Sequence, residues 1–162
     1  MRVVKNFLKE DYFNKLKAAF VDHNPDLPFY IQQRVAFETG PIDKKHFYFT
    51  HLLFNNSIKS SYYDLVKPFI WEILKVKALI RVKVNLYPRT DKLIHHDPHN
   101  DHDFKHKALV FSLNTCDGGT RIGKKFIPSI ANQALFFDGS VMHNSTTCTN
   151  KQARLNINFN YF

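Results

Sequence analysis

The sequence predicts a mainly β fold, in which N-terminal helices support a barrel or jelly-roll core. Residues 79–162 divide into about eight short apolar or alternating segments with turn residues between them, a pattern typical of barrels and jelly rolls. Residues 1–78 instead combine two apolar patterns of helical spacing with proline-containing loops. The chain has 162 residues, the length of one domain. We therefore expect a single domain, with residues 1–78 as a helical and loop buttress and residues 79–162 as the β-barrel core.

The N-terminal part contains two predicted helices. Residues 10–20 place apolar side chains three or four positions apart, with lysines facing outward. Prolines then divide the chain into loops and short extended pieces. A second helix is expected in the region 62–75, where Pro68 must either start the helix or kink it.

Strand-like alternation begins at Leu79. Apolar residues share one face of this segment, and the opposite face carries Arg81, Lys83, Asn85 and Tyr87. Residues 108–115 are almost wholly apolar, which indicates a buried central strand. The last ten residues alternate apolar and polar side chains, as a final strand with one buried face does. Further short strands are expected at residues 126–130, 134–137 and 141–147.

Composition and charge exclude several classes of protein. Apolar residues make up 44% of the chain, and a net charge of +9 suits anionic partners without indicating a reaction. No apolar run approaches the ~18–20 residues of a membrane span, and the N-terminus lacks the apolar region of a signal peptide. The two cysteines, Cys116 and Cys148, form no CxxC motif, which excludes a disulfide scaffold or a four-thiolate zinc site. We expect a soluble cytoplasmic protein with no membrane partner.

Histidines cluster early in the predicted β core. Alternate side chains of a strand point the same way, so His99 and Asp101 can hold one metal ion together. His143, on a later strand, would complete a face of two histidines and one carboxylate, which leaves coordination positions open as non-haem Fe(II) oxygenases require. The segment His95-His96-Asp97 has the same H-x-D spacing, and a solvated polar loop is the other interpretation of the cluster. The cluster holds five of the chain's nine histidines: His95, His96, His99, His102 and His106.

An arginine stands within the regular alternation of the last strand. Arg154 on an inward face would need a carboxylate partner, which its planar guanidinium binds through two hydrogen bonds. The alternative is an outward-facing arginine on an amphipathic strand.

Taken together, these segments resemble the Fe(II)/2-oxoglutarate-dependent oxygenase superfamily. Within it they resemble the prolyl-4-hydroxylase-like branch, including small stand-alone oxygenases of phages and bacteria. The resemblance covers about half of the chain and implies a double-stranded β-helix, a jelly-roll fold of cupin type, supported by a helical layer. The matching segments are Asn85-Leu86-Tyr87-Pro88, His99-Asn100-Asp101, Leu109-Val110-Phe111-Ser112-Leu113-Asn114, Phe136-Phe137-Asp138, Met142-His143 and Arg154-Leu155-Asn156-Ile157.

The resemblance implies a set of functional residues. His99, Asp101 and His143 would be the catalytic iron ligands, and they are preferred over His95 and Asp97 because the matching segments follow them at the family's spacing. Arg154 would bind the distal carboxylate of 2-oxoglutarate. Further residues implied at the cosubstrate are Tyr87, Asn85 and Asn156.

The implied activity is that of a dioxygenase that uses Fe(II), 2-oxoglutarate and O₂, with ascorbate as an optional reductant. It would hydroxylate an amino-acid or peptidyl side chain and release succinate and CO₂. The partner would be a small molecule, a peptide or a protein, in the host cytoplasm if a phage encodes the chain.

The sequence departs from the family pattern at two cosubstrate positions. Many relatives carry a serine where this chain has Asn156, and some hydroxylases carry a tyrosine where it has Phe111. Ser145 or Thr147, on the strand of His143, are candidates for the missing hydroxyl.

Two other functions remain open. The spacing of Asn85 with Tyr87 and of Arg154 with Asn156 is similar to that of nucleic-acid dealkylases of the same superfamily, and a charge of +9 would suit a phosphate backbone. The second arginine of that branch would fall near Asn160. The other candidate is a non-catalytic, metal-binding barrel of cupin type that uses the histidine cluster, and such a barrel has no need of Arg154.

Overall fold

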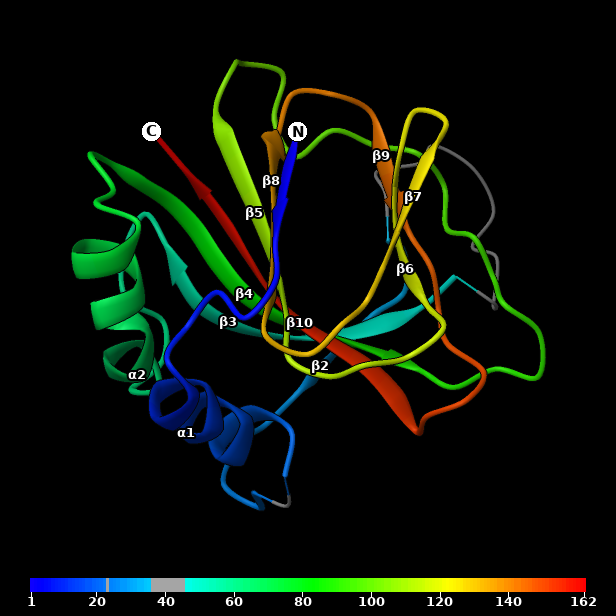
Figure 1. Cartoon of the computed structure of the whole chain (residues 1–162), viewed down its shortest axis with the longest axis horizontal. Helices are drawn as coiled ribbons and strands as arrows, with labels where there is room; N and C mark the ends of the chain where they lie inside the picture. Colours follow the sequence, from blue (N-terminus) through cyan, green and yellow to red (C-terminus); the bar gives the residue numbers. More distant parts are fainter. Residues whose placement is uncertain (23, 36–45) are drawn as a thin grey trace.

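Two antiparallel β-sheets face each other, and helices cover the outer side of the larger sheet (Figure 1). The computed structural model describes residues 1–22, 24–35 and 46–162. The prediction of a mainly β jelly roll with a helical layer is confirmed. The described elements are β1 (Arg2–Val4), α1 (Glu10–Phe20), β2 (Tyr30–Gln32), β3 (Tyr48–Asn55), α2 (Tyr63–Pro68), the π-helical segment η1 (Phe69–Ile73), β4 (Leu79–Pro88), β5 (Lys107–Ser112), β6 (Gly119–Ile122), β7 (Lys125–Pro128), β8 (Gln133–Asp138), β9 (His143–Ser145) and β10 (Ala153–Tyr161).

The larger sheet has seven strands in the order β1-β8-β5-β10-β4-β3-β2. Its centre is formed by β10, which pairs along most of its length with β4 on one side and with β5 on the other. The smaller sheet has the order β7-β6-β9. Figure 1 shows β6, β7 and β9 on one side of the large sheet and α1 and α2 on the other.

The two faces of the large sheet differ in chemistry. The outer face is apolar and packs against the helices; Val84, Phe111 and Ile157 are completely buried there with Phe13 of α1. The inner face, which meets the small sheet, is polar along β10 and β4. Burial of the apolar face drives the packing of helices on sheet, and the strict alternation of each strand then places the polar residues inside the barrel. The inward polar residues of β10 are Arg154, Asn156, Asn158 and Asn160.

The helices agree with the sequence prediction in position. Helix α1 spans Glu10–Phe20, as the apolar spacing predicts, and its acidic first turn complements the helix dipole. The second helical region is α2 followed by η1, and Pro68 is the last residue of α2. Proline removes one backbone donor from the ladder. The helix continues as a wider π-helical turn in which Phe69 and Ile70 are buried against the sheet.

Two expectations about strands need correction. Residues 1–78 contribute strands β1, β2 and β3 to the large sheet, where the sequence predicts helices, loops and only short extended pieces. Residues 79–162 contain seven strands, because the segment at His95 forms only an isolated bridge with Thr146. Among the described residues, no helix is long and apolar enough to cross a membrane. Cys116 and Cys148 are buried free thiols.

Candidate active site

His99 and His143 are held side by side by their own backbones. The His99 amide donates to the His143 carbonyl at 2.9 Å, and the His143 amide donates to the His99 carbonyl at 2.8 Å. These two hydrogen bonds hold the imidazole ring centroids 4.6 Å apart. The bridge connects the long β4–β5 connection to the start of β9, so the two histidines meet although they are far apart in the chain.

Asp101 completes this pair. Its amide donates to the Gly139 carbonyl at 3.0 Å, and its Oδ2 lies 3.9 Å from Nε2 of His143. One potential ligand atom from each of His99, Asp101 and His143 lies within 4.8 Å of the other two. In the part of the chain that the structure describes, this is the one group of three or more His, Cys, Asp or Glu side chains that could hold a metal ion.

Backbone carbonyls orient both histidine rings. Nδ1 of His143 lies 2.9 Å from the Val141 carbonyl, and Nδ1 of His99 lies 3.3 Å from the Asp97 carbonyl. A carbonyl only accepts hydrogen bonds, so each Nδ1 carries the proton and each Nε2 keeps a free lone pair. Burial and the neighbouring His143 lower the pKa of His99 to about 4, so its imidazole is neutral at physiological pH.

The Asp101 carboxylate is fixed from two strands. Arg81 Nη2 donates to Oδ1 at 2.6 Å, and Asn160 Nδ2 donates to Oδ2 at 2.8 Å. The same Asn160 amide also donates to Nε2 of His106 at 3.2 Å. Burial by itself raises the pKa of Asp101, but the cations of Arg81 and Lys83 outweigh it and hold the pKa well below the usual range. The carboxylate is therefore ionised and oriented.

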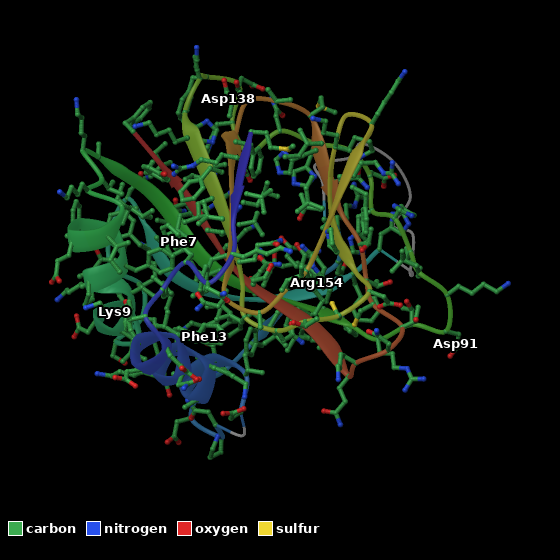
Figure 2. The ribbon with its side chains drawn as sticks, viewed as in Figure 1. Phe7, Lys9, Phe13, Asp91, Asp138 and Arg154 are labelled. Atoms are coloured by element: carbon green, nitrogen blue, oxygen red, sulfur yellow. The ribbon has the colours of Figure 1, made fainter. Side chains whose placement is uncertain are left out.

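Arg154 lies inside the barrel, on the side of β10 that faces the small sheet (Figure 2). Its side chain is 1% exposed. Nη2 donates to Thr120 Oγ1 at 2.9 Å and Nη1 donates to the Thr146 carbonyl at 3.2 Å, whereas Nε is buried without a partner. Within the described residues, no carboxylate pairs with this guanidinium. A buried cation without an anion is costly, so the site favours an anionic ligand.

Gly118 makes room for this arginine. A Cβ atom at this position would lie 2.1 Å from the Thr147 carbonyl oxygen and 3.1 Å from Cδ of Arg154. The first distance is far shorter than any van der Waals contact, so the chain can pass between the β9 region and Arg154 only as glycine.

A small cavity of about 30 Å³ connects Arg154 with the His-Asp-His group. The predicted cosubstrate residues Tyr87, Asn85 and Asn156 all line it. Asn85 Nδ2 donates to Asn156 Oδ1 at 3.0 Å. The Tyr87 ring stacks with Tyr48 and with His96, each at a centroid distance of 5.3 Å.

The hydroxyl that contacts Arg154 comes from an unexpected strand. Thr120 of β6 supplies it, and Ser145 lines the cavity. Thr147 instead hydrogen-bonds Thr90. Phe111 does not reach the cavity: it packs in the outer core, edge-on to Phe69 with centroids 5.0 Å apart, and Val110, on the opposite face of β5, lines the cavity in its place.

The second H-x-D segment does not reach His143. His95 is exposed, and the Asp97 carboxylate contacts His46 at 3.0 Å. His96 is buried, with Nδ1 2.9 Å from Ser145 Oγ and Nε2 without a partner.

A second, much larger cavity of about 1260 Å³ adjoins the His-Asp-His group. His99 and Asp101 line its inner end, and β2, β3 and the segment just before α2 form its outer walls. Arg81 and Lys83 of β4 also line it, and Lys83 lines the small cavity as well. The inward direction of Arg81 and Lys83 follows from the alternation of β4. No feature of the sequence, in contrast, predicts the contact of Thr120 with Arg154.

No protein-family model matches the sequence, and no curated protein matches it. The fold, however, is similar to solved structures along almost the whole chain. A prolyl-4-hydroxylase of Pseudomonas putida has a TM-score of 0.63 at 14% identity, with 99% of this chain and 91% of that chain covered. The viral collagen prolyl hydroxylase of Paramecium Bursaria Chlorella virus-1, solved as a 2OG complex, has a TM-score of 0.59 at 14% identity, with 98% and 93% covered.

A third similar structure is an oxidoreductase of the 2OG-Fe(II) oxygenase family from Burkholderia pseudomallei. Its TM-score is 0.66 at 10% identity, with 98% of this chain and 82% of that chain covered. At these identities the likeness is one of fold. The chain therefore has the jelly-roll fold of the prolyl hydroxylases and 2OG-Fe(II) oxygenases.

Proposed function

We propose that this protein is an Fe(II)- and 2-oxoglutarate-dependent dioxygenase that hydroxylates an amino-acid or peptidyl side chain. One observation carries the proposal above all. The buried guanidinium of Arg154, which has no acidic partner among the described residues, shares a cavity with the His99, Asp101 and His143 side chains. A non-catalytic metal barrel would need the histidines and the carboxylate but not this arginine.

The donor set fits iron. His99 and His143 offer imidazole Nε2 atoms, since the Nδ1 atom of each faces a backbone carbonyl, and Asp101 offers an ionised carboxylate whose orientation Arg81 fixes. Two histidines and one carboxylate bind on one side of a metal and leave the other positions open. His99, Asp101 and His143 would therefore hold Fe(II).

The polar groups around Arg154 fit the distal carboxylate of 2-oxoglutarate. Arg154 and the Thr120 hydroxyl are the donors in reach, and the Tyr87 ring lies 5.2 Å below the guanidinium carbon. The cavity of about 30 Å³ has room for roughly one water molecule, so binding requires its side chains to move. Lys83, a long and flexible side chain in the wall of this cavity, can make such a movement.

When bound, iron and 2-oxoglutarate supply the oxidising chemistry, and the decarboxylation of the cosubstrate yields succinate and CO₂. The protein's own groups bind and orient. Arg154 neutralises the distal carboxylate, and Arg81 and Asn160 keep Asp101 ionised and in one rotamer. The Tyr48, Tyr87 and His96 stack forms an aromatic wall of the barrel, which limits the access of water.

The choice of an amino-acid or peptidyl side chain is supported by the large cavity and by the relatives in fold. The cavity reaches His99 and Asp101 from outside, so a side chain entering it would meet the proposed iron. Two of the similar structures are prolyl hydroxylases, one of them a collagen prolyl hydroxylase.

The nucleic-acid dealkylase remains the alternative reaction. Its expected second arginine is absent at Asn160, and Arg81, which pairs with Asn160 across β4 and β10, reaches Asp101 in its place. Binding of single-stranded DNA that falls steeply with salt would favour this alternative.

Anaerobic titration with Fe(II) and 2-oxoglutarate tests the proposal. We expect the visible charge-transfer band of the iron–2-oxoglutarate chelate in the wild type. Arg154→Met should weaken 2-oxoglutarate binding by roughly 10- to 100-fold, because a charge-assisted contact is lost. The matched control is Arg89→Met, which removes an exposed arginine at the end of β4. The absence of the band in folded, iron-loaded wild type would contradict the proposal.

A further inference from the structure

The charge of Lys83 acts on Asp101, but Lys83 is not among the residues proposed to hold iron or the distal carboxylate of 2-oxoglutarate. It lies on the inward face of β4, and its closest polar contact is the Tyr48 hydroxyl, to which Nζ donates at 3.3 Å. The same ammonium lies 5.5 Å from the Tyr48 ring centroid. In the described part of the chain, no carboxylate lies within ion-pair distance of Nζ, and burial lowers the pKa of Lys83.

The position of Lys83 is unusual because it borders both cavities. It lines the small cavity beside Arg154 and also the inner end of the large cavity beside His99 and Asp101. An ammonium in this wall stands where a substrate would meet the proposed iron.

The charge of the large cavity adds a second observation. Its acidic lining residues are Asp26 and Asp101, and Asp101 is already paired with Arg81. The rest of its lining combines hydroxyl and amide groups with apolar surface. The cationic lining residues are Arg34, Lys59, Arg81 and Lys83. The charges of Arg81 and Asp101 compensate each other, so among the described lining residues Lys59 and Lys83 leave an excess of positive charge over Asp26, which attracts an anion.

Two anions could meet Lys83: the cosubstrate and the substrate. The distal carboxylate of 2-oxoglutarate is accounted for by Arg154 and Thr120, and its other carboxylate by the proposed iron. The substrate is therefore the remaining anion that could bind Lys83. We propose that the substrate carries a carboxylate or phosphate group close to its reacting carbon, and that Lys83 binds this group. This inference rests on the proposed function and names the substrate class of the same site.

The test measures binding without turnover. Anaerobic calorimetry on the Fe(II)- and 2-oxoglutarate-loaded protein would compare ligands that differ only in an anionic group. Capped glutamate against capped glutamine, and capped phosphoserine against capped serine, test an anionic side chain. N-acetylated amino acids against their N-acetylated amides test an α-carboxylate. The pair that shows selectivity identifies the source of the anion.

We expect the anionic member of at least one pair to bind roughly 10- to 100-fold more tightly, the range for a charge-assisted contact. Lys83→Met should abolish this selectivity, and Lys83→Arg should restore part of it. Lys124→Met removes an exposed lysine between β6 and β7 and should keep the selectivity. Thermal unfolding of each variant identifies misfolding, and Lys83→Gln replaces Lys83→Met if the methionine does not fold.

Three results would overturn the inference: no pair shows selectivity, selectivity persists in Lys83→Met, or Lys83→Met weakens 2-oxoglutarate binding as Arg154→Met does. The last result would assign Lys83 to the cosubstrate. The charge-transfer titration tests the proposed function separately. An intact band without anion selectivity contradicts the substrate class alone, whereas a missing band contradicts the function itself.

Discussion

Arg81 and Asn160 lie directly opposite each other on β4 and β10, and they bind the two oxygens of the same carboxylate. Arg81 donates to Oδ1 of Asp101 and Asn160 donates to Oδ2. The carboxylate is thereby held from two neighbouring strands of the large sheet, although Asp101 itself lies in the connection between β4 and β5. Its orientation depends on the sheet more than on the local chain.

The first prediction concerns these two supports of Asp101. Arg81→Met and Asn160→Ala should each weaken Fe(II) binding by about 10- to 100-fold, the usual effect of removing an outer partner of a metal ligand. Metal titration of the purified variants measures this. Arg89→Met, at an exposed position, should bind iron as the wild type does. If Arg81→Met and Asn160→Ala both bound iron as tightly as the wild type, metal binding by Asp101 would not depend on these two partners.

The second prediction separates the two H-x-D segments. His99→Ala should abolish stoichiometric Fe(II) binding, because it removes one of the three converging side chains. His95→Ala should leave iron binding unchanged, since His95 is exposed and does not face His143. Iron content after anaerobic loading distinguishes the variants. Retention of iron by His99→Ala would transfer the ligand assignment to the other segment.

The third prediction is a pH dependence of folding from His96. Burial, as the largest cause, lowers the pKa of His96 from 6.5 to about 3. As the pH falls below 6.5, His96 is protonated in the unfolded chain but stays neutral in the folded protein, so the free energy of unfolding decreases. From pH 6.5 to about pH 5 this contribution amounts to roughly 2 kcal/mol.

Denaturant unfolding of the metal-free protein at both pH values measures this contribution. His96→Gln should show a smaller loss of stability on acidification than the wild type. The neighbouring His95→Gln, at an exposed position, is the matched control and should behave as the wild type. Equal pH dependence in all three proteins would mean that other groups account for the acid sensitivity.

The fourth prediction concerns the glycine beside Arg154. Gly118→Ala should destabilise the fold by about 2 kcal/mol or more, because its Cβ would overlap the backbone at Thr147. It should also weaken 2-oxoglutarate binding, since the same Cβ presses on Arg154. Gly123→Asn is the control: Gly123 has a φ of +57° and open space around it, and asparagine tolerates this conformation. Similar losses for both variants would contradict the steric argument.

Hydrophobic periodicity identified the elements and faces well. The spacing of apolar residues predicted helix α1, and the alternation in β4 and β10 placed Arg154 and Lys83 opposite the apolar core. His99, Asp101 and His143 converge, but not for the reason that the H-x-D spacing suggested. His99 and Asp101 lie in the connection between β4 and β5 and are held by backbone hydrogen bonds to His143 and Gly139 rather than by a common strand.

The partners across the barrel could not be predicted in the same way. Periodicity reports the face of a strand but not which strand lies opposite, so Thr120 gave no sign of its contact with Arg154. Phe111 departs from the family pattern in its position as well as in its chemistry. Some hydroxylases carry a tyrosine at this position, whereas the alternation of β5 places Phe111 in the apolar core.

The pairing of the first strand with β8 has a consequence for how the chain folds. Val3 pairs with Leu135, and β1 is the edge strand of the large sheet next to β8. During synthesis β1 has no partner until β8 has left the ribosome, so the sheet can be completed only when most of the chain is available. Pairings this distant in sequence slow folding, because their loop entropy must be lost before the contacts form.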